Sequence, residues 1–197
     1  MFGGDLVGLD MYINRINKIE LEDKVYTSDE INEISSMTCT LKEFERAGDS
    51  LAQLLPYASK VKIINKYYNL EKMAEDNGLA HAHIGLISGE KIGINGKDSS
   101  GKTTLVYIPT EVVNEKYIIE RTEESYVWSC EEVAYWRKHY PLRDYFYELI
   151  GNVENCGYYL LDEEMIRDVK EKWSNDTESI PIEAPTENSA LFYHEWY

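Results

Sequence analysis

The chain has 197 residues, enough for one domain with a sizeable core, and 43% of them are hydrophobic, which excludes wholesale disorder. It carries 20 Lys and Arg against 36 Asp and Glu, a formal net charge of −16. Because such a surface repels nucleic-acid phosphate and anionic lipid, neither non-specific nucleic-acid binding nor membrane binding is expected. A protein with a basic surface is the favoured partner.

The cysteines and the first residues bear on location. Cys39, Cys130 and Cys156 form no CxxC pair and are odd in number, so a disulfide scaffold or a structural zinc site is not expected. Residues 1–5 have neither a basic start nor an apolar run, which argues against a signal peptide. No stretch approaches the roughly 18 apolar residues of a membrane span. We therefore expect a cytoplasmic protein.

The N-terminal part predicts a strand followed by helices. Alternating apolar residues favour a strand over residues 7–21. Two Thr-x-x-Glu capping boxes predict two helix starts, and an Asn-Gly pair at 77–78 is typical of a helix end. The expected helices begin after Thr27 and after Thr40, and a third covers residues 59–76.

The middle and the C-terminal part differ in character. Short β-branched and aromatic runs, separated by Gly, Asn and Ser, predict an antiparallel meander. Its strands are expected at residues 80–87, 91–95, 103–108 and 116–128. Beyond the meander we expect helices over 131–138 and 142–150, a strand over 157–161, and a last helix from Asp162 to about Trp173.

These elements predict an α+β protein with an N-terminal strand and helices, a central antiparallel β meander and C-terminal helices. We assign residues 1–173 to a single domain. Residues 174–190 are polar, contain two prolines, and predict a loop or linker. The aromatic segment 191–197 is expected to dock back onto the body.

One segment matches the phosphate-binding pattern GxxxxGK[ST], with Gly96, Gly101, Lys102 and Thr103 at the fixed positions. In nucleotide hydrolases this loop leads into a helix, whose N-terminus helps to hold the phosphates. Here a β-branched run follows and ends at Pro109, so we interpret the segment as a hairpin loop. A nucleotide hydrolase using Mg or Mn remains the alternative.

His81 and His83 place two imidazoles on one side of an expected strand, a spacing compatible with metal binding. No third ligand stands out, so the two are interpreted as ordinary strand histidines. No GxSxG turn or other nucleophile arrangement is present. We therefore assign no catalytic residue and no cofactor, and we do not expect an enzyme. A metal-dependent nuclease using Mg or Mn stays open as an alternative.

Acidic residues are concentrated in two segments. Residues 111–132 hold seven acidic and two basic side chains, and residues 162–197 hold ten and three. Tyr, Trp and Arg dominate binding hot spots, and carboxylates can take the place of phosphates in a basic groove. The candidate partner-binding residues are Tyr135, Trp136, Arg137, Glu123, Glu124, Glu131 and Glu132. The competing interpretation gives the 135–137 segment a structural role, with the Trp in the core.

Four segments, in the same order, resemble a group of small uncharacterised phage and prophage proteins. Residues 7–13 are similar to that group's GLDMYL opening, 132–138 to its EVxYWRK segment, and 155–159 to its DCxxY piece. Residues 192–197 resemble its aromatic ending. The likeness covers about a quarter of the chain, and Arg143 stands where the group's IHxWF segment has a histidine. It implies a phage or mobile-element origin and no particular reaction.

Charge and resemblance together lead to one functional hypothesis. The chain is expected to be a phage accessory protein that binds a basic surface on a host protein, such as a nucleic-acid-binding defence enzyme of the CRISPR effector type, and inhibits it. Beside the enzyme alternatives, a structural or assembly role in a phage particle also remains open.

Overall fold

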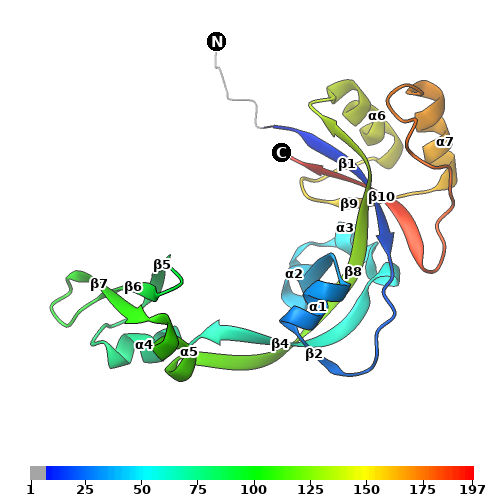
Figure 1. The fold of residues 1–197 in the computed structure, drawn as a ribbon. Coiled ribbons are helices and arrows are strands. Elements are labelled where there is room, and N and C mark those ends of the chain that lie inside the picture. Colours follow the sequence, from blue (N-terminus) through cyan, green and yellow to red (C-terminus); the bar gives the residue numbers. More distant parts are fainter. Residues whose placement is uncertain (1–7) are drawn as a thin grey trace, which may run out of the picture. The chain divides into compact units, whose positions relative to one another are not determined.

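Strand pairing organises the chain into two sheets, as shown by the computed structural model, which describes residues 8–197 (Figure 1). The seven-stranded sheet has the order β2-β4-β8-β1-β10-β9, with β3 also paired to β8. The three-stranded sheet has the order β5-β6-β7. Helices accompany both sheets, which confirms the predicted α+β class. In the part of the chain that is described, no helix is long and apolar enough to cross a membrane.

Contacts between residues divide the chain into two compact units. The large unit comprises the residues up to Ile63 together with Glu123–Tyr197, and the small unit comprises Ile64–Thr122. The large unit contains β1 (Asp10–Asn17), β2 (Val25–Thr27), α1 (Ser28–Ile34), β3 (Met37–Thr40), α2 (Leu41–Arg46), α3 (Asp49–Ala52), the 3-10 helix η1 (Leu55–Tyr57), α6 (Tyr140–Ile150), β9 (Tyr158–Leu161), α7 (Glu163–Lys172) and β10 (Ser189–Trp196). The small unit contains α4 (Leu70–Asp76), β5 (His83–Ile87), β6 (Lys91–Lys97), β7 (Thr103–Pro109) and α5 (Thr110–Lys116). Strands β4 (Ser59–Tyr68) and β8 (Ile118–Arg137) have residues in both.

The core of the large unit lies on both sides of β1. On one side, Phe146 of α6 and Ile166 of α7 pack with Met11 and Ile13 of β1. On the other side, α2, α3 and η1 cover Ile16 and the neighbouring strand residues. Strand β1 is therefore covered on both sides, although at different positions along its length.

Local sequence signals set the helix starts as predicted. Both capping boxes are present, at Thr27 with Glu30 and at Thr40 with Glu43. The backbone hydrogen bond from Thr27, followed by the contact with Lys24, lowers the pKa of Glu30 to about 2. Asp162 accepts the backbone hydrogen bond of Met165 and caps α7. These contacts satisfy backbone N–H groups that have no partner inside the helix.

The predictions of a helix over residues 59–76 and of a helix over residues 131–138 are wrong, the first for its N-terminal part. Residues 59–68 form β4, and α4 begins only at Leu70, although it ends before Asn77-Gly78 as predicted. In β4 the buried Val61 and Ile63 alternate with exposed lysines, the period of a strand, and β-branched residues favour that conformation. Residues 131–137 belong to β8, where pairing with β1 continues to Arg137. That long-range pairing overrides the local helical pattern.

The predicted meander is confirmed for three of its strands. Strand β6 pairs with β5 and β7 in antiparallel fashion. The fourth expected strand, 116–128, corresponds to the first part of β8, which belongs to the other sheet, and its residues 125–128 pair with β3. On one face of the meander, Ile92 and Ile94 pack against α4 and α5. On the other face, the exposed side chains of Leu86, Leu105 and Tyr107 lie around Gly93. Each has an atom within 3.3 Å of the position that a Cβ on Gly93 would take.

The expected docking of segment 191–197 takes the form of a strand. Strand β10 pairs with β1 along eight positions and with β9 along four. Residues 174–188 form no helix or strand, whereas Ser189 and Ala190, which the expected loop 174–190 included, belong to β10. At the other end, β1 spans Asp10–Asn17 within the predicted strand 7–21. Val7, and residues 1–5 for which no signal peptide was expected, lie outside the described residues.

A fully buried carboxylate lies in the large unit. The Glu195 side chain has no exposed surface, and the Tyr193 hydroxyl donates a hydrogen bond to its Oε2 at 2.8 Å. The Tyr147 hydroxyl donates to Oε1. Burial, followed by the hydrogen bond to Glu195, raises the pKa of both tyrosines. The two hydroxyls therefore remain protonated donors, and they offset the cost of burying Glu195.

Replacing Tyr193 with Phe is expected to lower the free energy of unfolding by about 1–3 kcal/mol, because one oxygen of a buried carboxylate loses its donor. Urea denaturation monitored by circular dichroism measures the change. Tyr107→Phe, at a side chain that is 48% exposed, is the matched control and is expected to stay within about 0.5 kcal/mol. Equal effects of the two substitutions would contradict the prediction.

Candidate functional site

Strand geometry gives the seven-stranded sheet two faces, because alternate side chains point to opposite sides. On one face, Met11, Ile13 and Tyr193 lie beneath α6 and α7. On the other, Ile16 and Phe192 are buried beneath α2, α3 and η1. Further along β1, this second face carries exposed side chains. We call the region of Asp10, Tyr12, Glu132, Tyr135, Arg137, His194 and Trp196 the open face.

A row of aromatic rings crosses the open face from β8 to β9. Strand register places Tyr135 beside Tyr12, and Tyr12 beside His194. His194 in turn lies beside Tyr158. The successive ring centroids are 5.1, 5.8 and 4.2 Å apart. Tyr158 is buried and Tyr135 is 44% exposed, so the row runs from the core into solvent and holds the outer rings in place.

A second row places a carboxylate beside these rings. Arg137, Asp10 and Trp196 are register partners on β8, β1 and β10. The Tyr135 hydroxyl donates to Asp10 Oδ1 at 2.6 Å, and Arg137 Nε lies 3.8 Å from the same oxygen. The side chain of Asp10 is 15% exposed and that of Arg137 is 66% exposed. Trp196, at 57% exposure, completes a surface of exposed aromatic and charged groups.

Glu132 supplies a second carboxylate to the open face. It lies opposite Asn14, next to a bulge in the pairing of β8 with β1. Burial, then Asp10, then Glu132 raise the pKa of Tyr12, while Arg137 opposes them. The hydrogen bond to Asp10, followed by burial, raises the pKa of Tyr135. Both phenols therefore stay protonated at neutral pH and can donate hydrogen bonds.

The structure separates the predicted Tyr135-Trp136-Arg137 segment between the two faces. Tyr135 and Arg137 lie on the open face with Glu132. Trp136 lies on the opposite face, packed against the cluster under α6, with its ring centroid 6.3 Å from that of Phe146. Its Nε1 donates to the carbonyl oxygen of Asp176 at 2.8 Å. This geometry favours the structural interpretation for Trp136.

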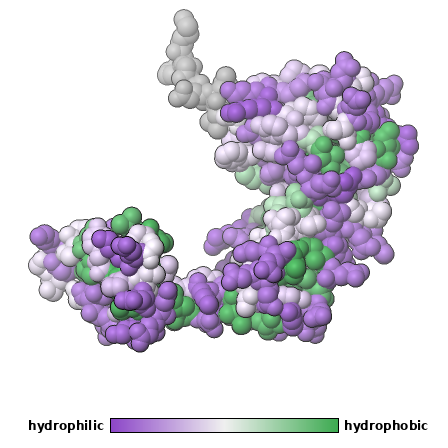
Figure 2. All heavy atoms as spheres, viewed as in Figure 1, coloured by the Kyte–Doolittle hydropathy of each residue, from purple (hydrophilic) through white to green (hydrophobic). Residues whose placement is uncertain are grey.

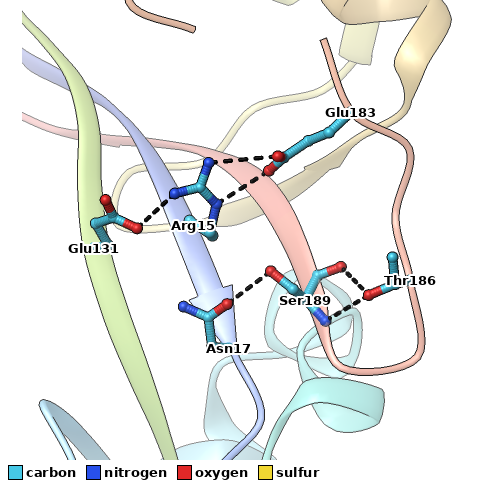
Figure 3. Close-up of polar contacts among 6 residues, drawn as sticks. All are labelled: Arg15, Asn17, Glu131, Glu183, Thr186 and Ser189. Atoms are coloured by element: carbon cyan, nitrogen blue, oxygen red, sulfur yellow. Dashed lines mark hydrogen bonds and ion pairs between the residues drawn. The ribbon is translucent and has the colours of Figure 1, made fainter. Parts of the chain in front are cut away.

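Glu131 forms an ion pair within the large unit. Arg15 Nη1 lies 2.6 Å from Glu131 Oε2, and Arg15 Nε lies 3.1 Å from Glu183 Oε1 (Figure 3). The hydrogen bonds to Glu183 and then Glu131 raise the pKa of Arg15. In the same close-up, the Ser189 hydroxyl donates to Asn17 Oδ1 at 2.7 Å (Figure 3). Arg15 therefore ties β1 to β8 and to the loop before β10, and it compensates two of the predicted surface acids.

The acidic run 111–132 is divided between the units. Three of its acids belong to the small unit and four, including Glu123 and Glu124, to the large unit. Glu124 forms an exposed ion pair with Lys60 at 2.9 Å, which contributes little to stability. The small unit has seven basic and eight acidic residues, a net charge of −1, so the large unit carries −15. Figure 2 shows that hydrophilic residues cover most of the visible surface of each unit.

The GxxxxGKT segment is a hairpin loop, as expected. Strands β6 and β7 pair up to Lys97 and Thr103, and Thr103 begins a strand rather than a helix. Asp98 Oδ1 accepts backbone hydrogen bonds from Ser100 at 2.9 Å and from Lys102 at 3.1 Å. Gly96 lies in β6 and Gly101 has a φ of 80° in the turn. The helix N-terminus that phosphate binding requires does not follow this loop.

His81 and His83 lie close together in the small unit, with ring centroids 5.2 Å apart, and both are exposed. Within residues 8–197, no group of three or more His, Cys, Asp or Glu side chains is placed to hold a metal ion. The two histidines therefore have no recognisable third ligand among the described residues.

Sequence reasoning did not assign Asp10, Tyr12 or Trp196 to the site. All three lie in segments 7–13 and 192–197, whose composition and spacing did not single them out as binding residues. Asp10 and Tyr12 contact Tyr135 because β8 pairs with β1, and Trp196 lies beside Asp10 because β10 pairs with β1 on its other edge. No sequence spacing reveals that arrangement, since the segments are more than a hundred residues apart.

Comparisons with known proteins do not indicate a function for this chain. No family model, curated protein or solved structure matches the chain. The functional conclusion therefore depends on the geometry of the open face and on the charge of the large unit.

His194 is expected to make stability depend on pH. Burial lowers its pKa below the ordinary value of 6.5, although a hydrogen bond with the Gly157 carbonyl opposes the shift. As the pH falls below about 6.5, the unfolded chain takes up a proton more readily than the folded one, so the free energy of unfolding decreases. His194→Phe keeps a ring on Tyr158 and is expected to flatten this dependence.

Urea denaturation of wild type and His194→Phe, between about pH 8 and about pH 5.5, measures the two slopes. The difference at the upper pH reports packing together with the loss of the hydrogen bond to the Gly157 carbonyl, because the imidazole is neutral there in both states. Identical slopes would contradict a role for His194.

The three cysteines are expected to differ in reactivity. Burial, with smaller contributions from nearby glutamates, raises the pKa of Cys39 and of Cys130 to about 11. Cys156 is exposed. Ellman's reagent at about pH 8 should therefore modify one thiol quickly and the other two only after unfolding. Cys156→Ser should abolish the fast phase, and a fast phase from two or more thiols would refute the assignment.

Proposed function

We propose that the protein is an acidic binding module whose open face docks onto a basic surface of another protein. One observation carries the proposal: Tyr135 and Trp196 are 44% and 57% exposed on a sheet region that holds two carboxylates beside them. Exposed Tyr and Trp side chains are the usual anchors of protein interfaces. Because strand pairing already orders them, little conformational entropy is lost on binding.

The charge of the large unit supports a basic partner. Its net charge of −15 attracts cationic surfaces over a distance of several ångströms and accelerates encounter. The same charge repels nucleic acid. A protein groove built for nucleic acid is basic by necessity, so it is complementary to this unit.

The resemblance to phage proteins suggests which protein carries that groove. The partner we propose is a host nucleic-acid-binding defence enzyme, such as a CRISPR effector, in the host cytoplasm. The chain would act as an accessory protein that occupies the groove and thereby inhibits the enzyme. Tyr135, Trp196 and the carboxylates of Asp10 and Glu132 would form the contact.

Binding to purified basic nucleic-acid-binding proteins of the host is the direct test, measured by biolayer interferometry at low and high ionic strength. Affinity is expected to fall as salt rises. Tyr135→Ala should weaken binding by about tenfold or more, as for a hot-spot residue. Tyr107→Ala is the matched control, because Tyr107 is 48% exposed but belongs to the small unit.

Two results would overturn the proposal. One is the absence of binding to every basic protein tested at low ionic strength. The other is binding that neither Tyr135→Ala nor Trp196→Ala weakens relative to the control. Melting temperatures of all variants establish that each is folded.

A further inference from the structure

The carboxylate of Asp10 can accept more hydrogen bonds than the described chain donates to it. Its Oδ1 accepts the Tyr135 hydroxyl hydrogen bond. Within the described chain, its Oδ2 takes part in no hydrogen bond or ion pair. The contact of Oδ1 with Arg137 is long, at 3.8 Å, and the Arg137 side chain is 66% exposed. A contact this long to a largely exposed guanidinium is weak, so another cation can replace Arg137 at this carboxylate.

Aromatic faces flank this carboxylate. Tyr12 and Tyr135 lie with ring centroids 5.1 Å apart, and Trp196 is the register partner of Asp10 on β10. Glu132 lies beyond the Tyr12–Tyr135 row from Asp10, because it is the register partner of Asn14. In the described chain Glu132 forms no ion pair. The open face therefore offers two carboxylates and several rings to one incoming cation.

We infer that the open face seats an arginine side chain of the basic partner, between the Tyr12 and Tyr135 rings and the carboxylates of Asp10 and Glu132. This inference rests on the proposed function and names the group that is recognised. A guanidinium is planar, stacks on aromatic rings, and is more weakly hydrated than an ammonium, so it suits such a site better than lysine does. Arg137 marks the position that a guanidinium can take beside Asp10.

Arg137 is expected to compete with an added arginine for Asp10. Removing the charge of Arg137 should therefore strengthen the binding of the added arginine. Asp10→Asn keeps an acceptor for the Tyr135 hydroxyl and removes the charge, so it should weaken binding without disturbing the sheet. Glu132→Gln should act in the same direction.

The probes are a short acetylated and amidated peptide with one arginine between glycines, and its lysine counterpart. Backbone amide NMR shifts of Tyr12, Glu132 and Tyr135, with the Trp196 indole signal, report binding. The arginine peptide is expected to bind about two- to fivefold more tightly than the lysine peptide. Asp10→Asn and Glu132→Gln should each remove this preference, and Arg137→Gln should increase arginine affinity about twofold.

Glu187→Gln is the charge-matched control, since Glu187 is exposed in the loop before β10. It should leave the arginine preference unchanged. Equal binding of the two peptides, or a preference that survives Asp10→Asn, overturns the arginine site. If Tyr135→Ala still weakens binding to basic proteins in that case, the proposed function stands without it. If neither peptides nor basic proteins bind, both fail.

Discussion

The structure depends on the pairing of β1 with both β8 and β10. Each pairing covers eight positions of β1, with a bulge on the β8 side. The backbone hydrogen bonds of a buried central strand leave few polar groups unpaired, and its apolar side chains enter the core on both sides. The same register places Asp10 and Tyr12 between side chains of β8 and β10. The open face is therefore a direct consequence of the way the core is assembled.

Two polar clusters reinforce this arrangement at different levels of burial. Glu195 is fully buried, and Tyr147 and Tyr193 each donate a hydrogen bond to one of its side-chain oxygens. Arg15 is partly exposed and links β1 to β8 and to the loop before β10. The first specifies how α6 approaches the sheet, and the second fixes the loop that precedes β10. Both lie on strands that also carry the open face.

The distribution of charge connects the fold to its proposed role. Nearly all of the net charge belongs to the large unit, while the small unit is close to neutral. Two of the seven acids of the run 111–132, Glu131 and Glu124, are paired with Arg15 and Lys60. An acidic run is therefore a poor guide to an interface by itself. The open face is distinguished because its carboxylates lie beside exposed rings on ordered strands.

Local signals in the sequence determined much of the secondary structure, because they act over a few residues. The capping boxes at Thr27 and Thr40, the hairpin loop around Gly101 and the meander could all be predicted in this way. Tertiary structure alone decided that residues 131–137 form a strand and that Tyr135 meets Tyr12. Those outcomes depend on backbone hydrogen bonds and burial between segments more than a hundred residues apart, which local preference does not encode.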